Sequence, residues 1–217
     1  MVSICLRPLL ILLALSAGLA AAEMSPAEIE ALLQKIPAGQ ARSLDFQETK
    51  KMRLLKDPVV TEGKLTVAPP GKVRREIRKP SPSLSVSDGA TLWLYYPEFA
   101  EAEKYDLSKN SPISKMIEAI TASFDLGKLR ELFDLRGERL TDGYALTLQP
   151  RNSALRKNVR ELRLSLSPEL KLARSRLIGK DGSETVTVYR NEKILPPAAG
   201  TFTFTPPPGV KVTEPLR

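Results

Sequence analysis

The spacing of hydrophobic residues changes near residue 42, from that of a helix to that of β-strands. Between residues 25 and 36 the apolar side chains recur three or four positions apart, which places them on one face of a helix. Ser25 precedes Pro26 and stands three positions before Glu28, as in a helix that begins with an N-cap, a first-turn proline and a capping box. The pattern predicts an amphipathic helix whose apolar side packs on another element.

From residue 42 onward most of the chain follows the period of two in which neighbouring side chains point to opposite faces of a sheet. We predict strands in segments 43–55, 63–69, 72–79, 83–87, 91–96, 101–107, 137–140, 144–150, 159–166, 170–179 and 184–191, and a last short strand at Phe202 and Phe204. Residues 111–135 return to helical spacing. They predict one helix after Ser111-Pro112 and a shorter one after Asp125.

Short turns join several of these strands, among them Asp88-Gly89, Ser167-Pro168 and Lys180-Asp181-Gly182. Consecutive strands joined in this way are antiparallel, and helices confined to the start and middle of the chain cover one face of the sheet. No internal repeat or low-complexity linker divides the chain. We therefore predict an α+β fold in a single domain, residues 23–217.

The strand at 91–96, with the sequence TLWLYY, is apolar on both faces. Leu92, Leu94 and Tyr96 share one face. Trp93 and Tyr95 share the other. A half-buried strand would carry polar residues on its second face, so both faces of this strand should be covered.

The N-terminus has the features of a secretory leader. Arg7 precedes a short apolar core at residues 9–15, and small residues follow at 20–22. The apolar core is shorter than the roughly 20 residues that a membrane-spanning helix needs. We predict a signal peptide, residues 1–22, that is cleaved on export. The alternative is a retained membrane anchor.

Composition narrows the chemistry that such an exported chain can perform. The chain has no histidine, and its one cysteine, Cys5, lies in the predicted leader. This excludes a thiolate nucleophile, a Ser-His-Asp triad and a zinc site of His or Cys ligands. We expect no cofactor, no metal and no enzymatic activity. Enzymes built on carboxylates or on a Ser-Lys pair remain compatible with the composition. The carboxylate candidates are Asp88 with Glu98 or Glu101, although these residues stand at a turn and a strand edge, where charges are normally solvated.

The formal net charge of +8 raises the question of an anionic partner. Lysine and arginine are spread along the chain, and the denser groups alternate with apolar residues as on a strand. Together with export, this argues against nucleic acid. Two interpretations stay open: a solvated strand face, or attraction to anionic lipid headgroups or an acidic partner.

Three segments, in order, resemble the LolA family of periplasmic outer-membrane lipoprotein carriers: DFQETK at 45–50, SDGATLWLYYPEFAEAEKYDL at 87–107, and FTFTPPPGVKV at 202–212. The resemblance implies a curved antiparallel sheet that forms an incomplete β-barrel, with a helical lid over its concave face. It further implies a monomeric periplasmic protein that holds acylated lipoproteins by their acyl chains. Such carriers receive cargo from an inner-membrane ABC transporter and deliver it to an outer-membrane receptor.

The residues expected to line the lipid cavity are apolar residues of the predicted strands and of the helix after residue 112. They are Leu44, Phe46, Met52, Leu65, Val67, Val73, Ile77, Leu92, Trp93, Leu94, Tyr95, Met116, Ile117 and Ile120. Acyl chains need many contacts of low directional demand, which aliphatic, aromatic and methionine side chains supply. The same pattern is also typical of an ordinary packed core.

The chain departs from the family at the arginine that helps to latch the lid, because Pro69 occupies that position and is followed by Pro70. Proline has no backbone N–H to donate. Arg74 or Arg75 on the next strand is a candidate replacement. The difference leaves open a LolA-like shuttle or sensor for another lipid or glycolipid, without lipoprotein transfer, and a protein that only binds a partner.

Overall fold

The computed structural model describes residues 22–36, 39–108, 113, 114, 117, 121, 126–194 and 196–215. Within this part of the chain, no helix has both the length and the apolar character needed to cross a membrane.

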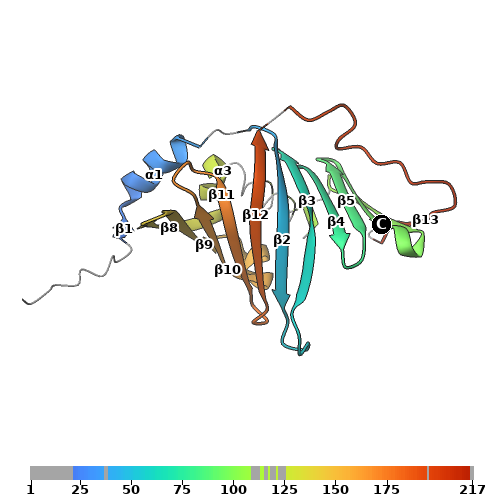
Figure 1. Cartoon of the computed structure of the whole chain (residues 1–217), viewed down its shortest axis with the longest axis horizontal. Coiled ribbons are helices and arrows are strands. Elements are labelled where there is room, and N and C mark those ends of the chain that lie inside the picture. The colour runs from blue at the N-terminus through green and yellow to red at the C-terminus, as the bar shows by residue number, and fades with distance from the viewer. Residues whose placement is uncertain are drawn as a thin grey trace, which may run out of the picture.

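Thirteen strands of the described chain form one sheet, in the order β1-β8-β9-β10-β11-β12-β2-β3-β4-β5-β6-β7-β13 (Figure 1). Their bounds are β1 Ala22–Met24, β2 Arg42–Lys51, β3 Val59–Ala68, β4 Lys72–Lys79, β5 Ser83–Asp88, β6 Thr91–Tyr96, β7 Glu101–Asp106, β8 Phe133–Leu140, β9 Gly143–Pro150, β10 Val159–Leu166, β11 Leu172–Gly179, β12 Glu184–Ile194 and β13 Lys211–Thr213. All neighbours are antiparallel except β7 and β13. The edge strands β1 and β13 do not pair, so the curved sheet is not closed. The predicted α+β fold with an incomplete barrel is confirmed.

The predicted N-terminal helix is α1, Pro26–Gln34. Ser25 and Glu28 form the predicted capping box: the Glu28 N–H donates to the Ser25 hydroxyl, and the Glu28 carboxylate accepts from the Ser25 N–H. The apolar stripe of α1 is buried against the sheet, and its closest strand is β8. Further helical segments of the described chain are α3 Leu126–Leu132, α4 Ser153–Asn158 and the 3-10 turn η1 Pro97–Phe99, and the described residues 113, 114, 117 and 121 are also helical.

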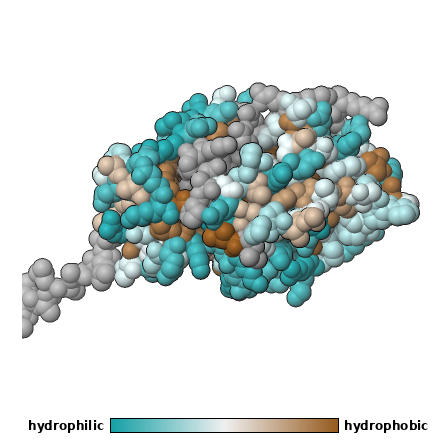
Figure 2. All heavy atoms as spheres, turned by 90° about the horizontal axis from the view of Figure 1, so that it is seen from above, coloured by the Kyte–Doolittle hydropathy of each residue, from teal (hydrophilic) through white to brown (hydrophobic). Residues whose placement is uncertain are grey.

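Buried apolar side chains form one cluster on the side of the sheet that α1 covers. The cluster draws on strands of both halves of the sheet, for example Leu44 of β2 and Leu148 of β9, and on Ile117 and Leu129 of the helical region. We call this side the concave face and the opposite side the convex face. Seen from above, hydrophobic side chains gather along the middle of the molecule with hydrophilic ones on both sides (Figure 2).

One predicted strand is not observed, and two short elements were missed. Phe202 and Phe204 are not in a strand, and the last strand is β13, which ends two residues before the end of the described chain. The segment between Phe204 and β13 is rich in proline, which has no backbone N–H to donate to a neighbouring strand. The helix α4 and the strand β1 were not predicted, because both are too short for a periodic pattern to identify.

Candidate functional site

On the concave face, β2, β3, β4 and β6 carry a row of apolar side chains, which Ser85 and Ser87 of β5 interrupt. Across the sheet, Leu44 is paired with Leu65, and Val67 with Val73. All four are buried, and Val67 is fully inaccessible. Because paired residues of neighbouring strands point to the same face, the row is a direct result of the register.

Most of the predicted cavity residues lie on this face. The members of the buried cluster are Leu44, Phe46, Leu65, Val67, Val73, Leu92 and Ile117. Ile77 and Leu94 are half-buried and pack against the cluster. Their joint position does not by itself distinguish a lipid-binding surface from a packed core.

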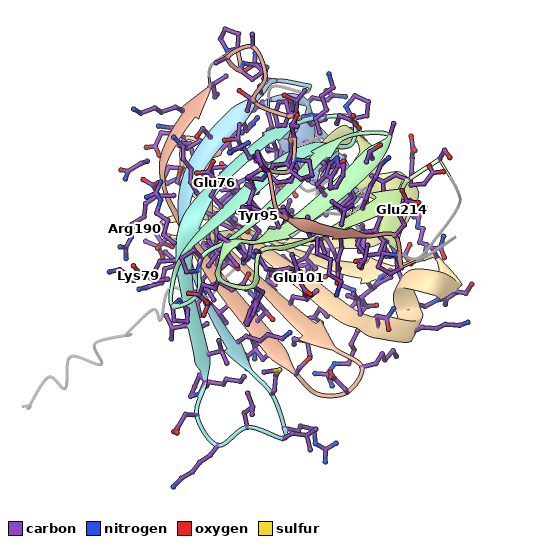
Figure 3. The ribbon with its side chains drawn as sticks, turned by 90° about the vertical axis from the view of Figure 1, so that its right-hand side faces the viewer. Glu76, Lys79, Tyr95, Glu101, Arg190 and Glu214 are labelled. Atoms are coloured by element: carbon purple, nitrogen blue, oxygen red, sulfur yellow. The ribbon has the colours of Figure 1, made fainter. Side chains whose placement is uncertain are left out.

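Trp93 and Tyr95 do not lie on the concave face. Trp93 pairs with Val86 and Lys104, and its neighbour Leu92 is in the concave cluster, so Trp93 points to the convex face. Phe204 from the C-terminal segment packs there, with ring centroids 5.7 Å from Trp93 and 5.2 Å from Tyr95. Figure 3 shows Tyr95 close to this segment. All four residues Leu92 to Tyr95 are cavity candidates from the sequence, which leaves open the face that lines the cavity; in the structure Leu92 and Leu94 lie on the concave face, and Trp93 and Tyr95 lie on the convex face.

This arrangement predicts a local effect of Phe204→Ala. Removing the ring should expose Trp93, the chain's only tryptophan, and shift its fluorescence to longer wavelength. The loss of two aromatic contacts and part of the burial should lower the free energy of unfolding by about 2 kcal/mol. Phe99→Ala is the control, since Phe99 is 71% exposed. Equal emission spectra for wild type and Phe204→Ala would contradict the placement of Trp93.

Of the three remaining predicted cavity residues, one lies away from the strands of the concave face and two fall outside the described residues. Met52 follows the end of β2 and lies in the β2–β3 turn, where its carbonyl accepts from the N–H of Leu55. Met116 and Ile120 lie outside the described residues.

The sequence-based list missed the second half of the concave face. Leu146, Leu148 and Leu164 are almost fully buried and continue the cluster across β9 and β10. Their strands show the same alternation of apolar residues as β2 and β3, so the pattern was present in the sequence. The segments that resemble the LolA family lie outside β9 and β10, so the resemblance indicates only the first half of the concave face.

A polar pair interrupts the apolar surface near the middle of the concave face. Arg75 pairs with Leu65 across β3 and β4, and its guanidinium binds the Glu48 carboxylate at 3.1 Å. The guanidinium also lies 4.6 Å from the centre of the Phe46 ring, as in a cation–π contact. The two charged side chains are 29% and 24% exposed, so they are accessible to a ligand on this face.

Arg74, the other latch candidate, lies on the convex face. It pairs with Val86, binds Glu76, and donates to the Thr201 carbonyl at 3.4 Å. Its contacts fasten the C-terminal segment to the sheet. A role for Arg74 in latching a lid over the concave face is therefore excluded by its direction.

Tyr105 adds a second polar group at the β6–β7 side of the concave face. Its hydroxyl donates to the Glu103 carboxylate at 2.6 Å. Burial, followed by this hydrogen bond and the charge of Glu103, raises the pKa of Tyr105 to about 12. The phenol therefore stays neutral well above its ordinary range.

The raised pKa predicts a loss of stability at high pH. In the unfolded chain Tyr105 ionises near its ordinary value of 10, and in the folded chain near 12. Stability is therefore unaffected by Tyr105 below pH 10 and falls as the pH rises towards 12. We expect urea unfolding to show a smaller decrease between these pH values in Tyr105→Phe than in wild type. Identical decreases in the two proteins would show that the ionisation of Tyr105 does not affect the free energy of unfolding.

The carboxylates considered for catalysis do not come together. Asp88 closes the β5–β6 turn, and Glu98 and Glu101 lie beyond the other end of β6. Partial burial raises the pKa of Asp88, but hydrogen bonds from the backbone N–H groups of Thr91 and Ala90 outweigh it and hold the pKa below its usual value. Asp88 thus acts as a turn-stabilising anion.

Grooves on the convex side are lined by charges. One of about 380 Å³ is bordered by Asp45, Glu62, Lys79 and Arg190, the last two labelled in Figure 3. Such a lining does not suit acyl chains. In the described part of the chain, no three Asp, Glu, His or Cys side chains gather in a way that suits a metal ion.

The sequence is similar to those of outer-membrane lipoprotein carrier proteins. The family model described as outer membrane lipoprotein carrier protein LolA matches residues 40–205. An outer-membrane lipoprotein carrier protein from Chromobacterium violaceum is 30% identical over 222 residues, covering 96% of this chain and 98% of the relative. One from Pasteurella multocida is 24% identical and covers 84% of this chain and 85% of the relative.

Among solved structures, a LolA superfamily protein from Nitrosomonas europaea aligns with a TM-score of 0.45 and 11% identity, over 81% of this chain and 97% of that chain. The family model spans most of the strands that build the concave face, and the first relative is aligned over nearly its whole length. The chain therefore belongs to the LolA family.

Proposed function

We propose that the protein is a periplasmic carrier that binds the acyl chains of lipoproteins on its concave face and moves them from the inner to the outer membrane. It acts as a monomer and performs no chemistry. The observation that carries the proposal is the cluster of apolar side chains from both halves of the sheet, on the concave side of an open, curved sheet. Membership of the LolA family supports the choice of cargo.

The apolar residues of the concave face suit acyl chains because each methylene removed from water contributes about 0.8 kcal/mol without demanding a particular geometry. Ile77 and Leu94 are half-buried members of this surface, so they remain partly open to a ligand. We assign first contact with the cargo to them, and the fully buried residues beneath them form the floor.

The Arg75–Glu48 ion pair is the polar feature near the middle of the proposed site. Of the two arginines considered as a replacement for the family's latch, Arg75 is the one on the concave face. We propose that Arg75 acts as the latch. When cargo is absent, Arg75 contacts the lid and holds it closed, and when the lid opens, Arg75 contacts Glu48 instead. Transfer from an inner-membrane ABC transporter and to an outer-membrane receptor is part of the same proposal.

Capture of cargo from membranes tests this function. Purified protein is incubated with spheroplasts of its own host, and hydrophobic material in the soluble fraction is identified by mass spectrometry. We expect acylated lipoproteins in one-to-one complexes with the protein. Recovery of a different lipid or glycolipid would replace the cargo and keep the site. Recovery of no hydrophobic cargo would overturn the carrier function.

A further inference from the structure

The turn between β2 and β3, residues 52–58, carries two adjacent leucines that are exposed. Leu54 is 97% exposed and Leu55 is 47% exposed. The turn is the lowest point of the molecule in Figure 1, and Figure 3 shows it projecting beyond the body of the sheet. Single exposed leucines are common, but two adjacent ones at a projecting tip form a compact apolar point.

Exposed cations surround this apolar point. Lys50 and Lys51 end β2, and Arg53 and Lys56 flank the two leucines. The β11–β12 turn lies alongside, since a Cβ atom on Gly182 would be 3.4 Å from Cδ of Arg53. That turn adds the exposed Lys180. We call these five cations and the two leucines the basic tip.

Three carboxylates lie in or beside the basic tip: Asp57, which is exposed in the turn, and Asp181 and Glu184, which have local partners. Asp181 accepts hydrogen bonds from the N–H and hydroxyl of Ser183 at 2.9 and 2.6 Å. Glu184 accepts from Nε of Arg176 at 2.7 Å. The five cations outnumber these three carboxylates, so the basic tip keeps an excess of positive charge.

We propose that the basic tip docks the protein on the surface of an anionic phospholipid bilayer. Leucines at the boundary of headgroups and acyl chains, with lysines and arginines at the phosphate level, combine the two attractions that hold peripheral proteins at membranes. A protein partner fits the tip less well, because a stable interface needs about 800 Å² per partner and the tip is a narrow projection. The contact is weak and reversible, which suits brief visits to a membrane.

The location of the basic tip relates docking to the rest of the fold. The strands β2 and β3 that end at the tip also carry Leu44, Phe46 and Leu65 of the concave face. Docking would therefore bring one end of this apolar surface towards the bilayer. The proposal itself does not depend on cargo binding, since the tip is separate from the concave face.

Flotation with vesicles tests the docking. Protein lacking residues 1–21, which keeps every described residue, is mixed at low salt with phosphatidylethanolamine vesicles that contain roughly a quarter phosphatidylglycerol. We expect wild type to float with these vesicles and to bind phosphatidylcholine vesicles much more weakly. Leu54→Asp combined with Leu55→Asp should reduce the bound fraction at least about tenfold. Phe99→Asp is the matched control, since Phe99 is 71% exposed elsewhere on the surface, and it should bind like wild type.

Charge reversal tests the second component. Lys51→Glu with Lys56→Glu should abolish the preference for anionic vesicles. The control is Lys72→Glu with Lys193→Glu. It changes the net charge by the same amount, but at the strand ends far from the basic tip, and it should reduce binding only slightly. Wild type that fails to float, or tip variants that float like wild type, would overturn the docking proposal. Because no cargo is present, this outcome is distinct from failure of the carrier function.

Discussion

Replacing Gly63 by alanine is expected to lower the free energy of unfolding by about 3 kcal/mol. Gly63 lies in β3 at an irregularity in the register with β4. A Cβ atom at this position would overlap the carbonyl oxygen of Glu76 and lie 2.9 Å from Cζ of Phe46. Because the nearest atom belongs to the backbone of the adjacent strand, the overlap can be relieved only by moving β4 or by displacing Phe46 from the concave face.

Urea unfolding measures this effect, with Gly39→Ala as the matched control. A Cβ atom at Gly39 would meet nothing within 4 Å, and its φ of 69° should cost only about 1 kcal/mol. If Gly63→Ala is no less stable than Gly39→Ala, this would contradict the close approach of β3 and β4 beside Phe46.

Leu94→Gln is expected to weaken the binding of acyl chains roughly 30-fold, which corresponds to about 2 kcal/mol. Leu94 is half-buried on the concave face, so the substitution removes apolar contact with the ligand and introduces an amide that must lose its hydration. The fold should tolerate it better than a substitution of the fully buried Leu148. Titration with a fluorescent fatty acyl probe measures the change.

The matched control is Leu84→Gln. Leu84 is also half-buried and lies on the neighbouring strand β5, but it pairs with Tyr95 and so points to the convex face. Its variant should bind the probe within about twofold of wild type. Equal losses in the two variants would mean that binding does not depend on the face, and would contradict the assignment of the site.

The alternation of residues was sufficient to predict most of the fold. Because side chains of a strand alternate between faces, the segments around Leu44, Val67 and Leu164 could be assigned to strands from the sequence. The capping box at Ser25 and Glu28 fixed the start of α1 correctly. The unclosed edges came from the family resemblance, since a periodic pattern does not say whether the first and last strands pair.

The side of the sheet that each residue faces required the structure. Alternation separates Trp93 from Leu94 but does not say which of them meets the helices, and the covering by Phe204 depends on residues more than 100 positions away in the chain. The same holds for Arg74 and Arg75, which are adjacent in sequence and lie on opposite faces. Met52 was assigned to a strand by its apolar character, although β2 ends one residue before it.

Site-specific photocrosslinking tests most directly the central claim, that the concave face holds the acyl chains of the cargo. A photoreactive benzoylphenylalanine replaces Leu94 in one variant and Tyr95 in another, so that two adjacent positions report on opposite faces. Each is incubated with lipoproteins from spheroplasts that were labelled with radioactive palmitate. We expect labelled crosslinks from position 94 and none above background from position 95. Crosslinks from position 95 alone, or from neither position, would contradict binding on the concave face.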